Sequence, residues 1–214
     1  MKKLKVGIVG VGSIARVAHI GNYNAMPDVE IAAVCDIVPE KMEFSGIPVG
    51  AAKYTDYREM IDTADIDAVD ICTPNDLHSE IAVYALGHGK HVFCEKPDAI
   101  SAAERQKMSE AEARSGKTLM VMRNNRHTAG SRYLKQCIEQ GEFGDIYAGR
   151  CGWIRRRGIP GKGGWFTTRA RSGGGPLIDL GVHMLDLAVW LMGSPKAVAV
   201  SGCTYCKFAD APDI

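Results

Sequence analysis

The residues best suited to acid–base chemistry lie in two short stretches, the first of which is Cys94-Glu95-Lys96-Pro97. It places a carboxylate and an amine directly after an apolar, strand-like run. A buried lysine beside a carboxylate can exchange a proton with a substrate hydroxyl. The alternative is a surface ion pair of little consequence. We also expect a cis bond between Lys96 and Pro97, because cis peptides occur chiefly before proline in tight turns.

The second stretch carries Asp179, His183 and Asp186 among apolar residues. In a helix these three side chains share one face, since neighbours at i+3 and i+4 meet. A carboxylate beside an imidazole fixes the tautomer of the ring and makes it a better base, which is what the oxidation of an alcohol requires. A satisfied core histidine and a divalent metal site are the alternatives. Three ligands on one helix face rarely converge, so we expect no metal.

The stretch from Lys5 to Ala15, KVGIVGVGSIA, has the spacing of a dinucleotide-binding turn between a strand and a helix. Gly10 allows the tight turn, and Gly12 lets the backbone come close to a pyrophosphate. Ala15 lets the helix sit close to the strand. The free N–H groups at the start of the helix would face the phosphates.

The next apolar run, residues 31–36, ends in Asp36, which stands 21 residues after Ala15. A carboxylate at this place can accept both ribose hydroxyls of an adenosine and would repel a 2′-phosphate. The sequence therefore predicts NAD in preference to NADP. A helix-capping aspartate before Pro39 is the alternative.

The first half of the chain alternates strand and helix, which is typical of a doubly wound parallel sheet. Ligands of such sheets bind at the carboxyl ends of the strands. Thr73 and Asn75 follow a predicted strand there, and Asp76 is expected to cap the next helix. We expect an abbreviated helix and a loop after Pro39. The predicted strands are residues 5–9, 31–36, 51–53, 68–72, 91–94 and 118–122, and the helices are 14–20, 56–61, 76–86 and 101–115.

The pattern changes after Met122, so we predict an NAD(P)-binding domain over residues 1–122 and the start of an α+β domain over 123–214. The second part should hold helices over 129–140 and 176–192. Strand-like runs over 145–154 and 197–206 predict an antiparallel sheet. A basic, glycine-rich loop over 155–164 follows the first of these runs. Since sheets usually have about five or six strands, later strands of this domain are expected to be missing.

Composition narrows the class of protein. The chain has 214 residues, 46% of them apolar, and a net charge of +1, which gives no reason to expect nucleic acid or an anionic membrane as a partner. No apolar run approaches the ~18 residues that cross a bilayer, and the start of the chain suggests a cytoplasmic protein. Most of the seven cysteines lie in strand-like runs (Cys35, Cys72, Cys94 and Cys151), as expected of small buried hydrophobes in a reducing compartment. Cys203 and Cys206 have redox or zinc spacing, but they lack a second pair.

Five motifs occur in a fixed order: G-V-G-S-I-A, C-T-P-N-x-x-H, E-K-P, N-x-R and G-G-G-x-L-I-D-x-G-x-H-x-x-D. In this the chain resembles the glucose-fructose oxidoreductase / inositol dehydrogenase (Gfo/Idh/MocA) family. The resemblance implies that Lys96 is the active-site lysine, Asp179 the substrate-binding acid and His183 the catalytic histidine. Family members oxidise a sugar or polyol hydroxyl, or reduce the ketone, with NAD(P).

The resemblance also implies that Thr73, Asn75, His78, Glu95 and Pro97 line the nicotinamide end. The full set of cofactor-binding residues that we predict is Gly10, Gly12, Ser13, Ile14, Asp36, Ile37, Thr73, Pro74, Asn75, His78, Glu95, Pro97 and Arg126. His127 departs from the family, in which an aromatic residue commonly follows the arginine of N-x-R. Members are also typically half as long again or more, so the chain resembles a truncated one.

The expected function is therefore an NAD-dependent oxidoreductase for a sugar or polyol, forming a homo-oligomer (a dimer or tetramer). Two alternatives remain open: an NAD-dependent glycosidase of the same family, and a non-catalytic, truncated NAD-binding protein. The five arginines 155–157, 169 and 171 form either an anion site or a solvated basic loop. Trp153 and Trp165 are either platforms for a sugar ring or part of the interface between the domains.

Overall fold

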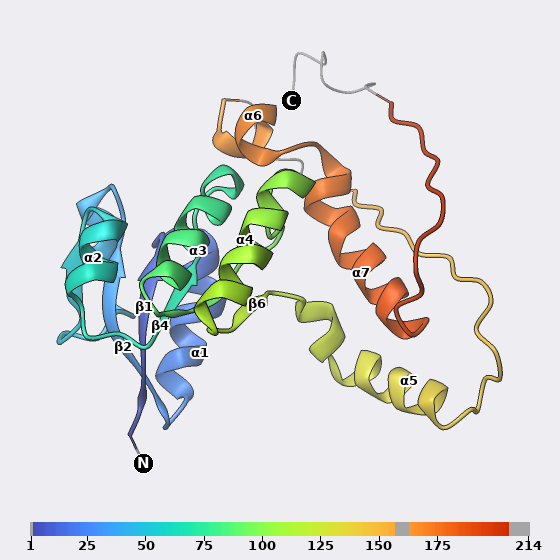
Figure 1. The fold of residues 1–214 in the computed structure, drawn as a ribbon, viewed down its shortest axis with the longest axis horizontal. Helices are drawn as coiled ribbons and strands as arrows, with labels where there is room; N and C mark the ends of the chain where they lie inside the picture. The colour runs from blue at the N-terminus through green and yellow to red at the C-terminus, as the bar shows by residue number, and fades with distance from the viewer. Residues whose placement is uncertain (1, 157–162, 206–214) are drawn as a thin grey trace. The chain divides into compact units, whose positions relative to one another are not determined.

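The computed structural model of the chain describes residues 2–156 and 163–205. It divides into two compact units, Met1–Met122 and Arg123–Ile214. Figure 1 labels the helices and strands of both units.

The first unit is built on a six-stranded parallel sheet in the order β3-β2-β1-β4-β5-β6. The chain runs outward from β1 in one direction and then returns to pair β4 on its other side, which makes the sheet doubly wound. The fold class predicted for this part of the chain is confirmed. The strands are β1 (Leu4–Val9), β2 (Val29–Cys35), β3 (Ala52–Tyr54), β4 (Ala68–Ile71), β5 (His91–Cys94) and β6 (Leu119–Val121).

Helices cover both faces of this sheet (Figure 1). A π-helical turn, Ala15–His19, continues into α1 (Ile20–Ala25) and packs with β1 and β2 on one face. On the other face lie α2 (Tyr57–Thr63), α3 (His78–Gly87) and α4 (Ala102–Ser115). Successive side chains of a strand point to opposite faces of the sheet. Ile8 of β1 therefore packs in the apolar cluster on the α1 face, and Val9 packs in the cluster on the face covered by α2, α3 and α4.

Local signals explain most of the helix ends. The Ser101 hydroxyl accepts from the Glu104 N–H at the start of α4, and Gly116 ends that helix with a left-handed φ of 64°. The abbreviated helix expected after Pro39 is a 3-10 turn, Pro39–Glu43. The predicted cap at Asp76 is wrong, because Asp76 lies inside a second 3-10 turn, Asn75–Leu77, and Leu77 precedes α3 without a capping side chain.

The regular secondary structure in the described residues of the second unit is helical. These are α5 (Ala129–Glu139), α6 (Arg169–Ser172) and α7 (Val182–Leu191), with a π-helical turn, Leu177–Gly181, leading into α7. Residues 145–156 and 195–205 have no regular structure, so the strands predicted over 145–154 and 197–206 are not formed in the described residues. A strand needs a neighbour for its backbone N–H and C=O groups, and these segments find none there. Residues 157–162 of the basic loop, and Cys206, lie outside the described residues.

Charged side chains join α7 to Arg123, Arg126 and α5. The Asp186 carboxylate on α7 accepts from the Arg126 guanidinium at 2.7 and 2.5 Å, and the Arg123 Nε lies 3.0 Å from it. Lys135 of α5 donates to the Trp190 carbonyl at 3.1 Å. Such bidentate arginine pairs are among the stronger charge-assisted hydrogen bonds, so they fix the orientation of α7.

One helical run differs from what composition suggested. Arg169–Leu191 has 23 residues and a mean hydropathy of 1.2 in its most apolar window, which meets the length and composition of a membrane span. None of this window is buried within the described residues, and a single such helix is weak evidence for a membrane span. The run includes Asp186, which is paired with two arginines.

Replacing Gly10 with alanine should destabilise the first unit. Gly10 has a φ of 92°, and an added Cβ would lie 2.7 Å from the Cys72 carbonyl oxygen. A left-handed non-glycine residue costs about 1–3 kcal/mol before that clash is counted. Gly21→Ala in α1 is the matched control, because its Cβ would meet nothing within 4 Å. Urea denaturation should show a loss of stability for G10A alone, and equal stability of the two variants would contradict this account.

Candidate active site

The carboxyl ends of the central strands lie at one level of the sheet. Val9 pairs with Cys35 on one side and with Ile71 on the other, and Ile71 pairs with Cys94. The residue after each strand continues the ladder by one bond: Gly10 N–H donates to the Cys35 carbonyl, Cys72 N–H to Val9, and Glu95 N–H to Ile71, at 2.8 to 2.9 Å. The glycine loop, Asp36, the Cys72–Asn75 segment and the Glu95–Pro97 turn therefore meet at one edge.

The glycine loop forms an open cradle at this edge. Gly10 is packed against the Cys72 backbone, whereas a Cβ on Gly12 would meet nothing within 4 Å. A hollow of about 280 Å³ lies beside Gly12, and its lining residues are Val11, Gly12, Ser13, Arg16, Val17 and Lys41. Backbone N–H groups at the start of a helix attract anions, so this hollow suits a diphosphate.

Asp36 lies beside this loop and is almost completely buried, at 6% exposed. Its Oδ2 accepts from Val11 N–H at 2.9 Å, and its Oδ1 accepts from Val38 N–H at 2.9 Å. Lys41 Nζ lies 3.3 Å from Oδ1. The carboxylate therefore bonds both the glycine loop and Val38, the residue that precedes the turn at Pro39. The side chain of Ile37 is 85% exposed at the same place.

The segment after β4 turns polar groups toward the same edge. Asn75 is buried, and the hydroxyl oxygen of Thr73 is buried without a hydrogen-bond partner in the described residues. His78 is fully buried, with Nδ1 2.7 Å from the Pro97 carbonyl and Nε2 2.9 Å from the Thr73 carbonyl. Burial lowers the pKa of His78, so the ring is neutral. The neutral ring lies between the Thr73 and Pro97 carbonyls and can donate to one of them at a time.

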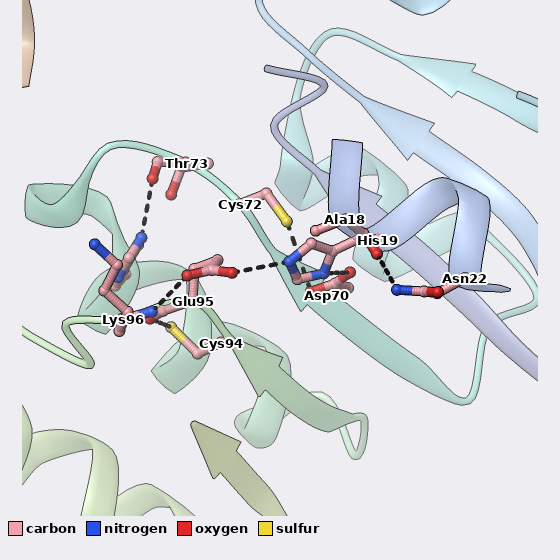
Figure 2. A network of polar contacts seen from close by, with 10 residues as sticks. Ala18, His19, Asn22, Asp70, Cys72, Thr73, Cys94, Glu95 and Lys96 are labelled. Atoms are coloured by element: carbon pink, nitrogen blue, oxygen red, sulfur yellow. Dashed lines mark hydrogen bonds and ion pairs between the residues drawn. The ribbon is translucent and has the colours of Figure 1, made fainter. Parts of the chain in front are cut away.

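A buried ionic network that the sequence did not reveal underlies the Glu95–Pro97 turn (Figure 2). His19 Nδ1 lies 2.8 Å from Asp70 Oδ2, and its Nε2 lies 2.9 Å from Glu95 Oε1. The other oxygen of Glu95 accepts from the backbone N–H of Lys96 at 3.0 Å. Glu95 is 7% exposed, so it is not half of a surface ion pair. The Lys96–Pro97 peptide is cis, as predicted.

The network shifts the titration of its members. Burial alone would lower the pKa of His19, but the hydrogen bonds to Asp70 and Glu95 outweigh it and raise the pKa to about 9. Burial would likewise raise the pKa of Glu95, yet its bonds to His19 and to the Lys96 N–H hold it below the usual value. At neutral pH the network holds an imidazolium between carboxylates.

The remaining predicted residues lie in the second unit. Asp179 lies in the π-helical turn and His183 on α7, with the Trp153 ring centroid 6.2 Å from that of His183. The carboxylate of Asp186, on the same helix as His183, is bound by Arg123 and Arg126. The guanidinium of Arg126, which we predicted to bind the cofactor, is held by this carboxylate.

Buried cysteines match the expectation for Cys35, Cys72 and Cys94, and Cys137 joins them. Cys151 is exposed, contrary to the prediction, because its strand is not formed. In the described residues, His19, Asp70 and Cys72 hold their potential metal-ligand atoms within 4.8 Å of one another.

Two family profiles match the chain. The one described as "Oxidoreductase family, NAD-binding Rossmann fold" covers residues 4–123, and the GFO/IDH/MocA C-terminal domain covers residues 131–213. The chain belongs to the GFO/IDH/MocA oxidoreductase family. The family and the fold class predicted from its motifs are thus confirmed.

Relatives in this family include enzymes that act on sugars and polyols. D-glucoside 3-dehydrogenase of Escherichia coli is 34% identical over 95% of this chain and 58% of its own length. Inositol 2-dehydrogenase of Salmonella paratyphi B is 39% identical over 66% of this chain and 43% of its own. The scyllo-inositol dehydrogenase of Lactobacillus casei, solved with NAD(H) and scyllo-inositol, has a TM-score of 0.64 at 30% identity and covers 68% of this chain and 43% of its own. The chain thus spans only about half the length of these relatives.

The His19 network predicts a specific dependence of stability on pH. Because the pKa of His19 rises from 6.5 to about 9 on folding, its contribution to the free energy of unfolding is complete below pH 6.5. It should be lost as the pH rises through about 9. Urea denaturation at several pH values should show this loss in the wild type relative to His19→Gln, which lacks the titrating ring. A constant difference between the two proteins from pH 6 to pH 10 would contradict the assignment.

Proposed function

We propose that this chain supplies the cofactor domain and catalytic groups of an NAD-dependent oxidoreductase. It would transfer a hydride between a sugar or polyol CH–OH group, or the matching ketone, and nicotinamide. The observation that carries the proposal is the open cradle at Gly12 beside the buried Asp36 carboxylate, on the same sheet edge as Lys96. The dehydrogenase relatives support it.

The residues present fit a nicotinamide dinucleotide. The space at Gly12 takes the diphosphate, and the partnerless hydroxyl of Thr73 offers a hydrogen bond at the same edge. Lys41 Nζ lies 3.3 and 3.4 Å from the two oxygens of Asp36, and ribose hydroxyls would take its place as donors to the carboxylate. The exposed side chain of Ile37 gives an apolar surface for the adenine. When bound, the nicotinamide accepts or returns the hydride.

The proton is handled by the chain itself. His183, oriented by Asp179, would take the hydroxyl proton of the substrate, and the Lys96 amine would polarise the same oxygen. As that O–H bond breaks, the hydride leaves the carbon and the carbonyl forms. Asp179 and His183 lie one helical turn apart, which supports this pairing. A cytoplasmic location and a homo-oligomer stay predictions.

Cofactor binding is the first test. We expect NADH, titrated by fluorescence, to bind more tightly than NADPH, because the Asp36 carboxylate repels a 2′-phosphate. Gly12→Ala should keep the stability of the wild type, since its Cβ has free space. It should nevertheless bind NADH at least about tenfold more weakly, a loss of about 1.4 kcal/mol. If neither dinucleotide binds, or if G12A binds like the wild type, the proposed cofactor site is wrong.

Lys96 is the second test. Lys96→Met should lower turnover by about 10²-fold or more if the amine takes part in proton transfer. Lys90→Met is the matched control, because Lys90 precedes β5 as Lys96 follows it, and its Nζ binds the Ile66 carbonyl. The measurement is NADH formation with a panel of polyols and sugars. Equal turnover of K96M and K90M would remove Lys96 from the mechanism, and hydrolysis of a coloured glycoside without net NADH would favour the glycosidase.

A further inference from the structure

His19 occupies an unusual position for a histidine. It is 3% exposed, and each of its two ring nitrogens lies within 2.9 Å of a different carboxylate, Asp70 or Glu95. An ionised carboxylate only accepts hydrogen bonds, whereas a neutral imidazole can donate only one. Both bonds are made at once when the ring carries two protons. The buried charges are then one positive between two negative, which is what makes their burial tolerable.

This arrangement ties three separate parts of the first unit together. His19 ends the π-helical turn that follows the glycine loop, Asp70 belongs to β4, and Glu95 begins the turn after β5. Glu95 is fixed on both sides, with Oε1 on His19 and Oε2 on the Lys96 N–H. Figure 2 shows His19 between the two carboxylates, with Lys96 directly beyond Glu95. The backbone that carries the Lys96 amine is therefore held by a carboxylate whose own place depends on His19.

We propose that His19 is a positioning residue for Lys96, acting through Glu95 as a buried imidazolium. What Lys96 does rests on the proposed function, but the positioning itself does not. Without the imidazolium the Glu95 carboxylate would be buried and uncompensated, so it would rotate toward solvent or take up a proton. Rotation releases the Lys96 N–H, and protonation weakens its bond because the acceptor loses its charge. A misplacement of about 1 Å at a reacting group can cost about 10²-fold in rate.

The surroundings of His19 favour this role over a metal site. Tyr23 of α1 and Cys72 both lie at Asp70, and burial raises the pKa of each, so both stay protonated and act as donors to that carboxylate. Phe93 covers the ring, with centroids 5.8 Å apart. Both nitrogens of His19 are used in direct bonds to carboxylates, and neither is left as a metal ligand. The charged groups that face His19 are Asp70 and Glu95, with Lys96 beyond Glu95.

Three single variants separate positioning from packing. His19→Gln removes the charge but keeps a polar side chain, and Glu95→Gln keeps the size of the carboxylate while removing its charge. Tyr23→Phe is the matched control, because Tyr23 contacts the Asp70 side of the network and does not take part in the link from His19 to Lys96. All three are compared at pH 7 with the wild-type chain, after urea denaturation has confirmed that each is folded.

Amide hydrogen exchange of Lys96 gives a readout that needs no activity. The Lys96 N–H is bonded to Glu95, so its exchange should accelerate at least about tenfold in H19Q and E95Q. It should stay at the wild-type rate in Y23F, and amides of β1 should stay protected in every variant. Ring ¹⁵N spectra of the wild type should show both nitrogens of His19 protonated at pH 7. A neutral His19, or unchanged exchange at Lys96 in H19Q, would overturn the proposal, as would stoichiometric zinc in the purified chain.

Turnover gives the second readout wherever the wild type reduces NAD with a polyol. H19Q and E95Q should lower kcat by about 10- to 10²-fold, with the KM for the polyol within about twofold, while Y23F keeps the wild-type kcat. Wild-type kcat in H19Q would overturn the proposal. A wild-type chain that shows the expected exchange at Lys96 but no turnover would refute the proposed function and leave the positioning by His19 standing.

Discussion

The first unit depends on how its parallel strands pair at their carboxyl ends. Val9, Cys35, Ile71 and Cys94 stand at one level of four adjacent strands, and the residue after each bonds back across the sheet. Parallel strands all deliver their carboxyl ends to the same edge, so this single register brings together loops that are far apart in the sequence. A shift of one residue in any strand would turn its side chains to the other face. In β1 such a shift would disrupt the packing on both faces, because Ile8 packs in one apolar cluster and Val9 in the other.

Buried charges also hold the loops that the strand register brings together. The sheet edge carries three buried carboxylates, those of Asp36, Asp70 and Glu95. They are compensated in two ways: Asp36 by two backbone N–H groups and Lys41, and Asp70 and Glu95 by the shared His19. Because an uncompensated buried carboxylate is costly, the bonds of Asp36 and Glu95 also fix the loops that they contact. The glycine loop and the Lys96 turn are thus held by the same physical requirement.

How far the sequence leads depends on the range of each signal. The glycine spacing, Asp36 and Glu95–Pro97 follow strands of clear apolar pattern, so their meeting at one edge could be predicted. His19 and Asp70 could not, because each is a single polar residue in an apolar context, and their pairing crosses 51 positions of the chain. An acid inside the strand 68–72 was a signal that a partner must exist, but it did not say which. The strands expected over 145–154 and 197–206 are not formed in the described residues for a related reason. Periodicity indicates which face of a strand is apolar, whereas a strand also needs a neighbouring strand for its hydrogen bonds.

In the second unit, Asp186 has a structural role that its helical spacing did not indicate. Asp186 shares a helix face with Asp179 and His183 by spacing, yet its carboxylate is bound by two arginines from residues 123–127. An isolated pair on a surface would contribute little, but this bond is bidentate and partly buried. This bond holds α7 in place. His183 lies on the same helix, about one turn before Asp186. The Arg126–Asp186 bond therefore ties the 3-10 turn Asn124–His127 to the helix that carries His183.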